Sequence, residues 1–247
     1  MKILSLNLHC FQEENRIEKL NKIISFIKEN DIEICIFQEA AQEIKEPLII
    51  DKIRQGNNAH YIALALNYNI CFHPIKVGFF VLEEGLAFIS KYPINNPKYK
   101  TISNTKDFKT WCKRDYLSVE INNIIFYNVH LGWDSPNENS FDQINNLLEE
   151  TLKHNNLLFI CGDFNHSDNT KQINHIKTKY YSVADLIGLN SYENPTFHNN
   201  LDNNDKTENK MIDFIFTNKK IPIKSFKIVF KEEQNYVSDH NGILIEI

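Results

Sequence analysis

The sequence lacks the features that mark exported, membrane-spanning and metal-thiolate proteins. No apolar run reaches the roughly 18 residues that a membrane helix needs, and the N-terminal segment MKILSLNLHC has no small-residue cleavage site. The 5 cysteines form no CxxC pair, and Cys35 and Cys161 lie inside apolar runs, where a reduced thiol packs as a small hydrophobic group. We therefore expect a cytoplasmic protein that starts at Met1 and contacts no membrane.

Glycine, proline and excess positive charge are also scarce. The 247 residues include 7 Gly and 7 Pro, and no Pro/Gly/Ser-rich linker divides the chain, so we expect a single domain over 1–247. A net charge of −5 argues against duplex DNA as a partner, because backbone binding to DNA needs a concentrated cationic face. The hydrophobic fraction of 42%, with 17 Phe and 10 Tyr, is enough for a large core and excludes a disordered chain.

Apolar periodicity predicts a chain dominated by strands. A period of two over residues 2–8 is typical of a strand with one face in a core. Further strands are predicted at 33–38, 86–90, 116–121, 124–130, 157–161, 212–217, 225–230 and 243–247. Asn122 and Asn123 tolerate positive φ and predict a tight hairpin.

Helical spacing occurs in fewer places. It predicts helices at 15–29, at 140–153 with Ser140 as its cap, and over 170–188 with a break. Residues 42–80 show no clear pattern. The polar, aperiodic segment 190–210 is predicted to be a long surface loop.

Polar side chains gather where the predicted strands end. Any one of them alone is typical of a turn or a cap, but an unsatisfied buried carboxylate loses several kcal/mol of hydration, so a whole set at such positions indicates a site. The set comprises Asn7, Glu39, Glu84, His130, Asp163, Asn165, Asp213, Asp239 and His240.

The residue types in this set favour hydrolysis of a phosphate ester. Glu39 can bind a hard cation through oxygen, with Asn7 completing or orienting that shell, and such donors favour Mg²⁺ or Mn²⁺ over Zn²⁺. His130 and His240 have acidic partners available, for which we choose Glu84 and Asp213. Most of the other histidines are expected at the surface, namely His9, His60, His73, His154, His166, His175 and His198.

The ordered motifs resemble the endonuclease/exonuclease/phosphatase superfamily over nearly the whole chain. They are LNLH, FQEA, EEGLAFISKYPI at 83–94, NVHLGW at 128–133, GDFN at 162–165, IDFIF at 212–216 and SDH at 238–240. The resemblance implies an α/β fold, a four-layer α-β-β-α sandwich of two mostly antiparallel sheets with outer helices. It also implies a metal-dependent phosphoesterase site at one end of the sheets.

The resemblance further implies a role for each residue of the set. Glu39 is similar to the principal metal ligand, with Asn7 beside it and Asp239 supporting the metal or its waters. Asp163 and Asn165 are similar to residues that align the water and the phosphoryl oxygens. His240 with Asp213 resembles the essential acid–base pair, and His130 with Glu84 resembles a second pair. Arg114 stands where a cation contacts the phosphate.

A closer resemblance, to sugar-phosphate phosphatases of the maltose 6'-phosphate phosphatase type, rests on EEN at 13–15, EEGLAFISKYPI, WCKR around Trp111, and HLGW. It implies a Mg²⁺-dependent phosphatase acting on a small phosphomonoester. Trp111 and Trp133 could pack on a sugar ring while Lys113 or Arg114 meets the phosphate. The alternative for Trp133 is packing beneath the 134–140 loop.

Three other functions remain open at this point. Lysines in the middle of the chain keep a nuclease or other phosphodiesterase in consideration, and it would show steep salt dependence. A catalytically inactive binding module would keep the scaffold without turnover. A secreted sphingomyelinase-like enzyme is disfavoured, because the sequence shows neither an export signal nor a recognisable exposed apolar hairpin.

Overall fold

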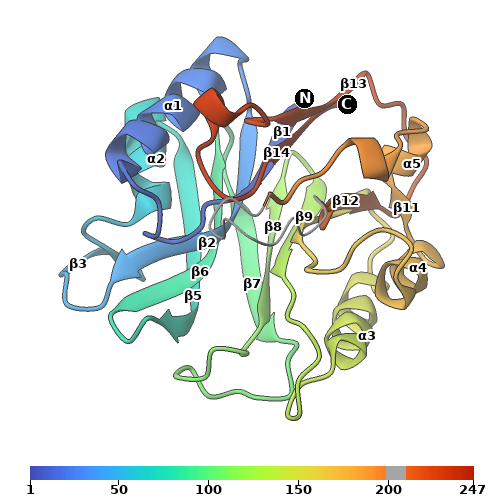
Figure 1. The fold of residues 1–247 in the computed structure, drawn as a ribbon, viewed down its shortest axis with the longest axis horizontal. Helices are drawn as coiled ribbons and strands as arrows, with labels where there is room; N and C mark the ends of the chain where they lie inside the picture. The colour runs from blue at the N-terminus through green and yellow to red at the C-terminus, as the bar shows by residue number, and fades with distance from the viewer. Residues whose placement is uncertain (199–209) are drawn as a thin grey trace.

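Two six-stranded sheets pack face to face, with helices on their outer faces (Figure 1). The computed structural model describes residues 1–198 and 210–247. The first sheet has the strand order β13-β14-β1-β2-β6-β5, and the second sheet has the order β11-β12-β10-β9-β8-β7. Most neighbouring strands run antiparallel, and the parallel pairs are β1 with β2 and β9 with β10. The predicted mixed α/β sandwich is confirmed.

The strands fall into these two sheets and one small hairpin. The first sheet contains β1 (Lys2–Asn7), β2 (Ile34–Glu43), β5 (Asn69–Gly78), β6 (Leu82–Ser90), β13 (Ser225–Val229) and β14 (Gly242–Glu246). The second contains β7 (Asn95–Thr101), β8 (Asp115–Ile121), β9 (Ile124–His130), β10 (Leu158–Asp163), β11 (Tyr181–Ser182) and β12 (Asp213–Thr217). The small hairpin pairs β3 (Leu48–Ile50) with β4 (Ile53–Arg54).

The helices cover opposite sides of the sandwich. In Figure 1, α1 and α2 lie against the first sheet, whereas α3, α4 and α5 lie on the side of the second sheet. Their bounds are α1 (Arg16–Glu29), α2 (Asn58–Leu66), α3 (Ser140–Thr151), α4 (Lys171–Lys177) and α5 (Val183–Leu186), with 3₁₀ turns η1 (Ser191–Glu193) and η2 (Glu233–Asn235). None of the helices in the described ranges is long and apolar enough to cross a bilayer.

Side-chain alternation in β1 and β2 divides the core into two layers. Ile3 and Ile34 pack toward the second sheet, whereas Leu4, Leu6 and Phe37 pack under α1. This period of two follows from the pleat of a strand. It also places Asn7, the last residue of β1, on the face that meets the second sheet, where its side chain reaches Asp163 of β10 at 3.1 Å.

Strand register aligns three functional side chains in one row of the second sheet. Asp163 at the end of β10 is paired with His130 of β9 on one side and with Asp213 of β12 on the other. Gly162 permits this close packing, because a Cβ atom there would lie 1.9 Å from the carbonyl oxygen of Val129, and its φ of +143° disfavours other residues. The glycine of the GDFN motif therefore sets the approach of β9 and β10.

Several local predictions are corrected by the structure. The unpatterned segment 42–80 contains β3, β4, α2 and β5, and the edge strand β7 was also missed. The α3 helix is capped by Asn139, whose side chain accepts a hydrogen bond from Phe141, rather than by Ser140. The Asn122–Asn123 hairpin is confirmed, with φ of 51° and 61° at its two residues.

The predicted surface loop at 190–210 is wrong for Thr196 and His198, which are buried with the half-buried Phe197 between them. Residues 199–209 lie outside the described residues. The Thr196 hydroxyl accepts the backbone N–H groups of Ile212 and Asp213, both at 3.0 Å. The His198 backbone N–H donates to the Asp239 carbonyl at 3.1 Å. This stretch thus joins the start of β12 to the turn that carries Asp239.

The expected surface position of most remaining histidines is also wrong. Four of them are buried, namely His9, His60, His73 and His198. His73 is held by Asp115 at 2.8 Å and stacks on Tyr99, in a polar contact between the sheets. His9 lines the pocket described next.

Candidate active site

A pocket of about 690 Å³ opens at the ends of β9 and β10, beside the turn that precedes β14. Of the residues that the sequence motifs single out, the pocket wall contains Glu39, Glu84, Trp111, Arg114, His130, Trp133, Asp163, Asn165, Asp239 and His240. Asn7 and Asp213 lie directly behind this wall and hydrogen-bond to residues in it. The structure therefore brings together side chains from the first strand to the last.

Asn7 fixes the two carboxylates nearest the centre of the site. Its amide nitrogen donates to Glu39 Oε1 at 3.0 Å and to Asp163 Oδ2 at 3.1 Å. Its amide oxygen accepts the His9 backbone N–H at 2.9 Å, which leaves the nitrogen directed at the carboxylates. Of the two roles considered for Asn7, these bonds favour orientation of the carboxylates over direct coordination of an ion.

Left-handed backbone occurs repeatedly around the pocket. Glu39 has φ of 48° at a register shift between β2 and β6, and Asn165 has φ of 54°. The Asp163 side chain accepts the Asn165 N–H at 2.8 Å, while the Asn165 amide donates to the Leu131 carbonyl at 2.8 Å. Such conformations cost of order 1 kcal/mol or more in non-glycine residues and persist where neighbouring contacts hold them. Here they aim side chains into the pocket.

His240 and Asp213 form a short, buried acid–histidine pair. Nδ1 of His240 lies 2.8 Å from Asp213 Oδ2, and its Nε2 lies 3.7 Å from Asp163 Oδ2. Burial alone would lower the pKa of His240, but Asp213, Asp163 and Asp239 outweigh it and raise that pKa. The neighbouring carboxylates therefore favour the imidazolium form of His240, while burial raises the pKa of Asp213.

His130 has a looser arrangement with Glu84. Its Nδ1 lies 3.6 Å from Glu84 Oε1, beyond hydrogen-bond length, and its Nε2 lies 3.6 Å from Asp163 Oδ2. Glu84 is shared, because its Oε1 also lies 3.0 Å from Nζ of Lys76. Burial would raise the pKa of Glu84, but Lys76, His130 and Arg114 hold it below the usual value.

One wall of the pocket carries buried cations and exposed aromatic rings. Lys76 and Arg114 are buried, and Arg114 Nε has no hydrogen-bond partner within the described part of the chain. Trp111 and Trp133 line the same pocket with exposed fractions of 56% and 54%, so Trp133 does not pack beneath the 134–140 loop. Lys113 is instead paired with Asp115 at 2.6 Å, which leaves Arg114 to face a ligand.

The pocket residues that the sequence interpretation did not assign to the site include Lys76, His9 and Phe197. Lys76 stands opposite Glu84 in the β5–β6 hairpin, so a lysine facing that acid across two strands was the available signal. His9 follows β1, and Phe197 packs edge-to-face on the His240 ring at 5.1 Å. His9 is the last residue of the LNLH motif, which was interpreted through Asn7 alone, and Phe197 carries no motif.

An exposed apolar turn borders the pocket, contrary to the sequence interpretation. Phe79, Phe80 and Val81 connect β5 to β6, and Phe80 is 96% exposed. Phe79 also lines the pocket. The chain therefore does have an exposed apolar hairpin, so this argument against a lipid-directed enzyme no longer holds.

Comparison with known proteins identifies the family of this chain. The model of the Endonuclease/Exonuclease/phosphatase family matches residues 4–240. The chain belongs to this family. No curated protein matches the chain.

Solved structures agree with that assignment. A family protein from Leptotrichia buccalis C-1013-b is 26% identical with a TM-score of 0.88, covering 100% of this chain and 99% of that one. The human Nocturnin catalytic domain with bound sulfate anion is 15% identical with a TM-score of 0.69, covering 99% and 93%. An AP endonuclease from Archaeoglobus fulgidus is 16% identical with a TM-score of 0.70, covering 100% and 99%. The last two likenesses show the fold alone.

Membership in the endonuclease/exonuclease/phosphatase family makes the protein a metal-dependent phosphoester hydrolase, and its donor atoms fit a divalent ion. Glu39, His130 and Asp163 offer ligand atoms within 4.8 Å of one another. Among the described residues, no lysine or arginine lies within 4.0 Å of the carboxylates of Glu39, Asp163 or Asp239. Neighbouring carboxylates without a cation of the chain suit a bound metal.

Proposed function

We propose that the protein is a Mg²⁺-dependent phosphatase that hydrolyses a small phosphomonoester, with a sugar phosphate such as maltose 6'-phosphate as its substrate. The observation that carries this proposal is the guanidinium of Arg114 in the pocket wall, held by the carbonyls of Trp111 and Lys113, together with two half-exposed tryptophans in the same wall. A terminal phosphate matches such a donor, and a sugar ring matches the aromatic faces.

The carboxylates of Glu39 and Asp239 would hold the ion, with Asn7 keeping Glu39 in place. When bound, Mg²⁺ supplies neutralisation of charge on the phosphoryl oxygens. Oxygen donors favour Mg²⁺ or Mn²⁺ over Zn²⁺. The nearby Cys10 thiol stays protonated, because burial and Glu39 raise its pKa, and it donates to Glu39 Oε2 at 3.3 Å.

The chain's own residues position the reactants on either side of the phosphorus. Asp163 and Asn165 align the attacking water and a phosphoryl oxygen, and the His240 imidazolium, held by Asp213, donates to the charge that develops. His130, beside Glu84, assists the leaving oxygen, while Arg114 and Lys76 bind the phosphate. Because phosphoryl transfer needs mainly positioning and charge neutralisation, no covalent nucleophile is required.

A phosphate-release screen over sugar phosphates, mononucleotides and short oligonucleotides, with Mg²⁺ and with excess EDTA, tests this proposal. We expect phosphate release from sugar phosphates, with loss of at least about 100-fold in EDTA. The His240→Ala variant serves as the inactive control. Plasmid nicking or oligonucleotide cleavage without sugar-phosphate turnover would assign the chain to the phosphodiesterases instead. No turnover of any ester, including an aryl phosphate, would assign it to the binding modules.

A lipid phosphodiesterase is the second candidate, and the exposed apolar turn 79–81 favours it. Phe79 connects that turn to the pocket, so a headgroup could enter while the turn meets the lipid. Phosphocholine release from sphingomyelin vesicles is the deciding measurement. Release that Phe80→Ser reduces at least about tenfold, with sugar phosphates inert, would replace the first proposal.

A further inference from the structure

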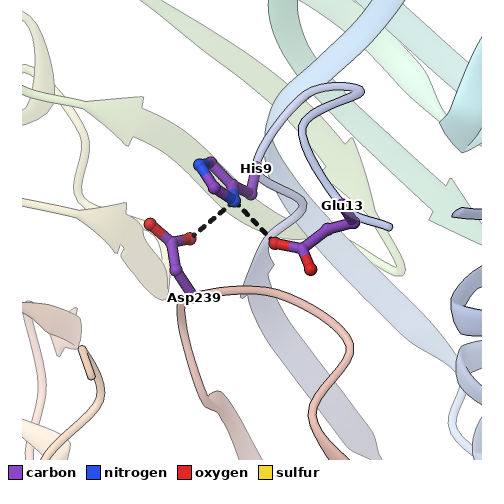
Figure 2. A group of neighbouring side chains, drawn as sticks. All are labelled: His9, Glu13 and Asp239. Atoms are coloured by element: carbon purple, nitrogen blue, oxygen red, sulfur yellow. Dashed lines mark hydrogen bonds and ion pairs between the residues drawn. The ribbon is translucent and has the colours of Figure 1, made fainter. Parts of the chain in front are cut away.

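One imidazole in the pocket wall belongs to neither acid–histidine pair. His9 directly follows Leu8 beyond the end of β1, lines the pocket and is 8% exposed. Figure 2 shows its ring between the side chains of Glu13 and Asp239, with one ring nitrogen directed at both. That nitrogen, Nδ1, lies 2.6 Å from Glu13 Oε1 and 3.5 Å from Asp239 Oδ1.

His9 repeats the construction of the two recognised pairs. In all three histidines a carboxylate oxygen faces Nδ1 of the ring. The distances are 2.8 Å from Asp213 to His240, 3.6 Å from Glu84 to His130 and 2.6 Å from Glu13 to His9. The Nε2 atoms of His240 and His130 consequently face the centre of the site, near Asp163. In Figure 2 the Nε2 of His9 points away from both acids, and it has no hydrogen-bond partner among residues 1–198 and 210–247.

The chain holds His9 firmly in this position. Lys19 of α1 forms an ion pair with Oε2 of Glu13. This ion pair holds the Glu13 carboxylate in place, and the carboxylate in turn holds the His9 ring. The His9 backbone has φ of 51° and donates its N–H to the Asn7 side chain at 2.9 Å. A left-handed residue held by a buried amide is a costly arrangement for a side chain without a function.

A separate cation site at His9, Glu13 and Asp239 is the alternative, since their ligand atoms lie within 4.8 Å of one another. The pairing of Glu13 with Lys19 opposes it, because that carboxylate already has its cation. The 2.6 Å contact to Glu13 also requires Nδ1 to carry a proton, so Nδ1 has no lone pair for a metal. The ring is therefore arranged to present Nε2 to a ligand.

We propose that His9 binds the substrate by donating a hydrogen bond from Nε2 to an oxygen of its phosphate group, and that Glu13 is the positioning residue for that contact. This inference rests on the proposed phosphatase function.

Kinetics and phosphate binding of four variants test the proposal. His9→Ala removes the donor, His9→Gln keeps an amide N–H near the position of Nε2, Glu13→Gln loosens the ring, and His60→Ala is a matched control. His60 is buried to the same degree, 7% exposed, but lies in α2 away from the pocket. The readouts are KM, kcat, the inhibition constant of inorganic phosphate and the Mn²⁺ dissociation constant by calorimetry, with circular dichroism to verify folding.

We expect His9→Ala to raise KM and the phosphate inhibition constant about 10- to 100-fold, the loss typical of a hydrogen bond to a charged group. Glu13→Gln should give a smaller change in the same direction, about 3- to 10-fold, and His9→Gln should restore part of the loss. Mn²⁺ affinity and the His60→Ala enzyme should stay within about twofold of wild type.

Two results would overturn the inference. An unchanged phosphate inhibition constant in folded His9→Ala removes the proposed contact, and a weaker Mn²⁺ affinity with normal phosphate binding makes His9 a support for Asp239 instead. If wild type hydrolyses no phosphomonoester, the proposed function fails on its own. Binding of inorganic phosphate to the Mn²⁺-loaded proteins then still decides His9, with equal affinity in wild type and His9→Ala refuting it.

Discussion

The two acid–histidine pairs of the pocket differ in how exclusively the acid serves its histidine. Asp213 lies 2.8 Å from His240 Nδ1, and its backbone N–H is held by the buried Thr196 hydroxyl. Glu84 lies 3.6 Å from His130 Nδ1 and is nearer to Lys76, at 3.0 Å. One carboxylate is thus dedicated to its ring, whereas the other is divided between a ring and an ammonium group.

This difference separates two kinds of catalytic support. The His240 pair keeps a charged donor in a fixed place, because three neighbouring carboxylates raise the pKa of His240 against the effect of burial. The Glu84 side carries two cations and one anion, so it attracts a negatively charged group while leaving His130 free to adjust. We infer that the first pair serves the chemical step and the second serves the phosphate and the leaving oxygen.

The largest expected effect comes from breaking the dedicated pair. His240→Ala should lower kcat/KM at least about 1000-fold, equivalent to about 4 kcal/mol, since the developing charge loses its donor. Asp213→Asn should lose nearly as much, because a neutral partner neither charges nor orients the ring. Steady-state kinetics on the best substrate of the screen measures both. Retention of more than about a tenth of wild-type kcat/KM by His240→Ala would contradict the assigned role.

A smaller loss is expected from the shared carboxylate. Glu84→Gln should reduce kcat/KM about 10- to 50-fold, because Lys76 and Arg114 still attract the phosphate. Glu84→Gln added to His130→Ala should cost little more than His130→Ala alone if the acid acts through the ring. A double-mutant cycle over these two positions measures this coupling. Strictly additive losses would show that Glu84 acts through Lys76 rather than through His130.

The sequence was sufficient to predict the pairing of His240 with Asp213, but not to predict that Glu84 is shared between His130 and Lys76. GDFN and SDH each place a polar residue after apolar residues, whereas IDFIF places Asp213 at the start of a strand, and register then brings Asp163 next to Asp213. Lys76 lies in β5, an edge strand with a register shift between Pro74 and Lys76, where apolar alternation is interrupted. Its role depends on a strand pairing that no local pattern encodes.

His9 was missed for a different physical reason. A left-handed turn after β1 brings its ring against Glu13 and Asp239, which are respectively near and very distant in the chain. Periodicity predicts the face of a residue inside a strand, but it stops at the strand end. The burial of Thr196 and His198 was missed likewise, because the polar composition of the segment 190–210 is typical of a surface loop. In the structure the Thr196 hydroxyl and the His198 backbone hydrogen-bond to backbone groups of other segments.

The last expected effect concerns stability rather than turnover, on the His240 side of the pocket, where a second buried histidine lies nearby. His198 stacks on Tyr236 with ring centroids 3.8 Å apart. Burial, reinforced by the charge of His240, lowers the pKa of His198 from 6.5 to about 4. The pKa of His198 is therefore lowered and that of its neighbour His240 is raised, so their surroundings favour opposite protonation states.

The pH dependence of unfolding tests this contrast. Below pH 6.5 the unfolded chain takes up a proton at His198, whereas the folded protein does so only near pH 4. The contribution of neutral His198 to the free energy of unfolding is therefore complete above pH 6.5 and declines as the pH falls below it. The loss reaches at most about 3 kcal/mol by pH 4. His198→Phe keeps the stacking and cannot titrate, so urea unfolding at pH 7, 5.5 and 4.5 should show a shallower decline than wild type. His175→Phe, at an exposed contact with Asn145, should follow the wild-type slope. Equal slopes for His198→Phe and wild type would mean that His198 takes up its proton in the folded state near the usual pKa, and His240 would then share its surroundings with a second positive charge.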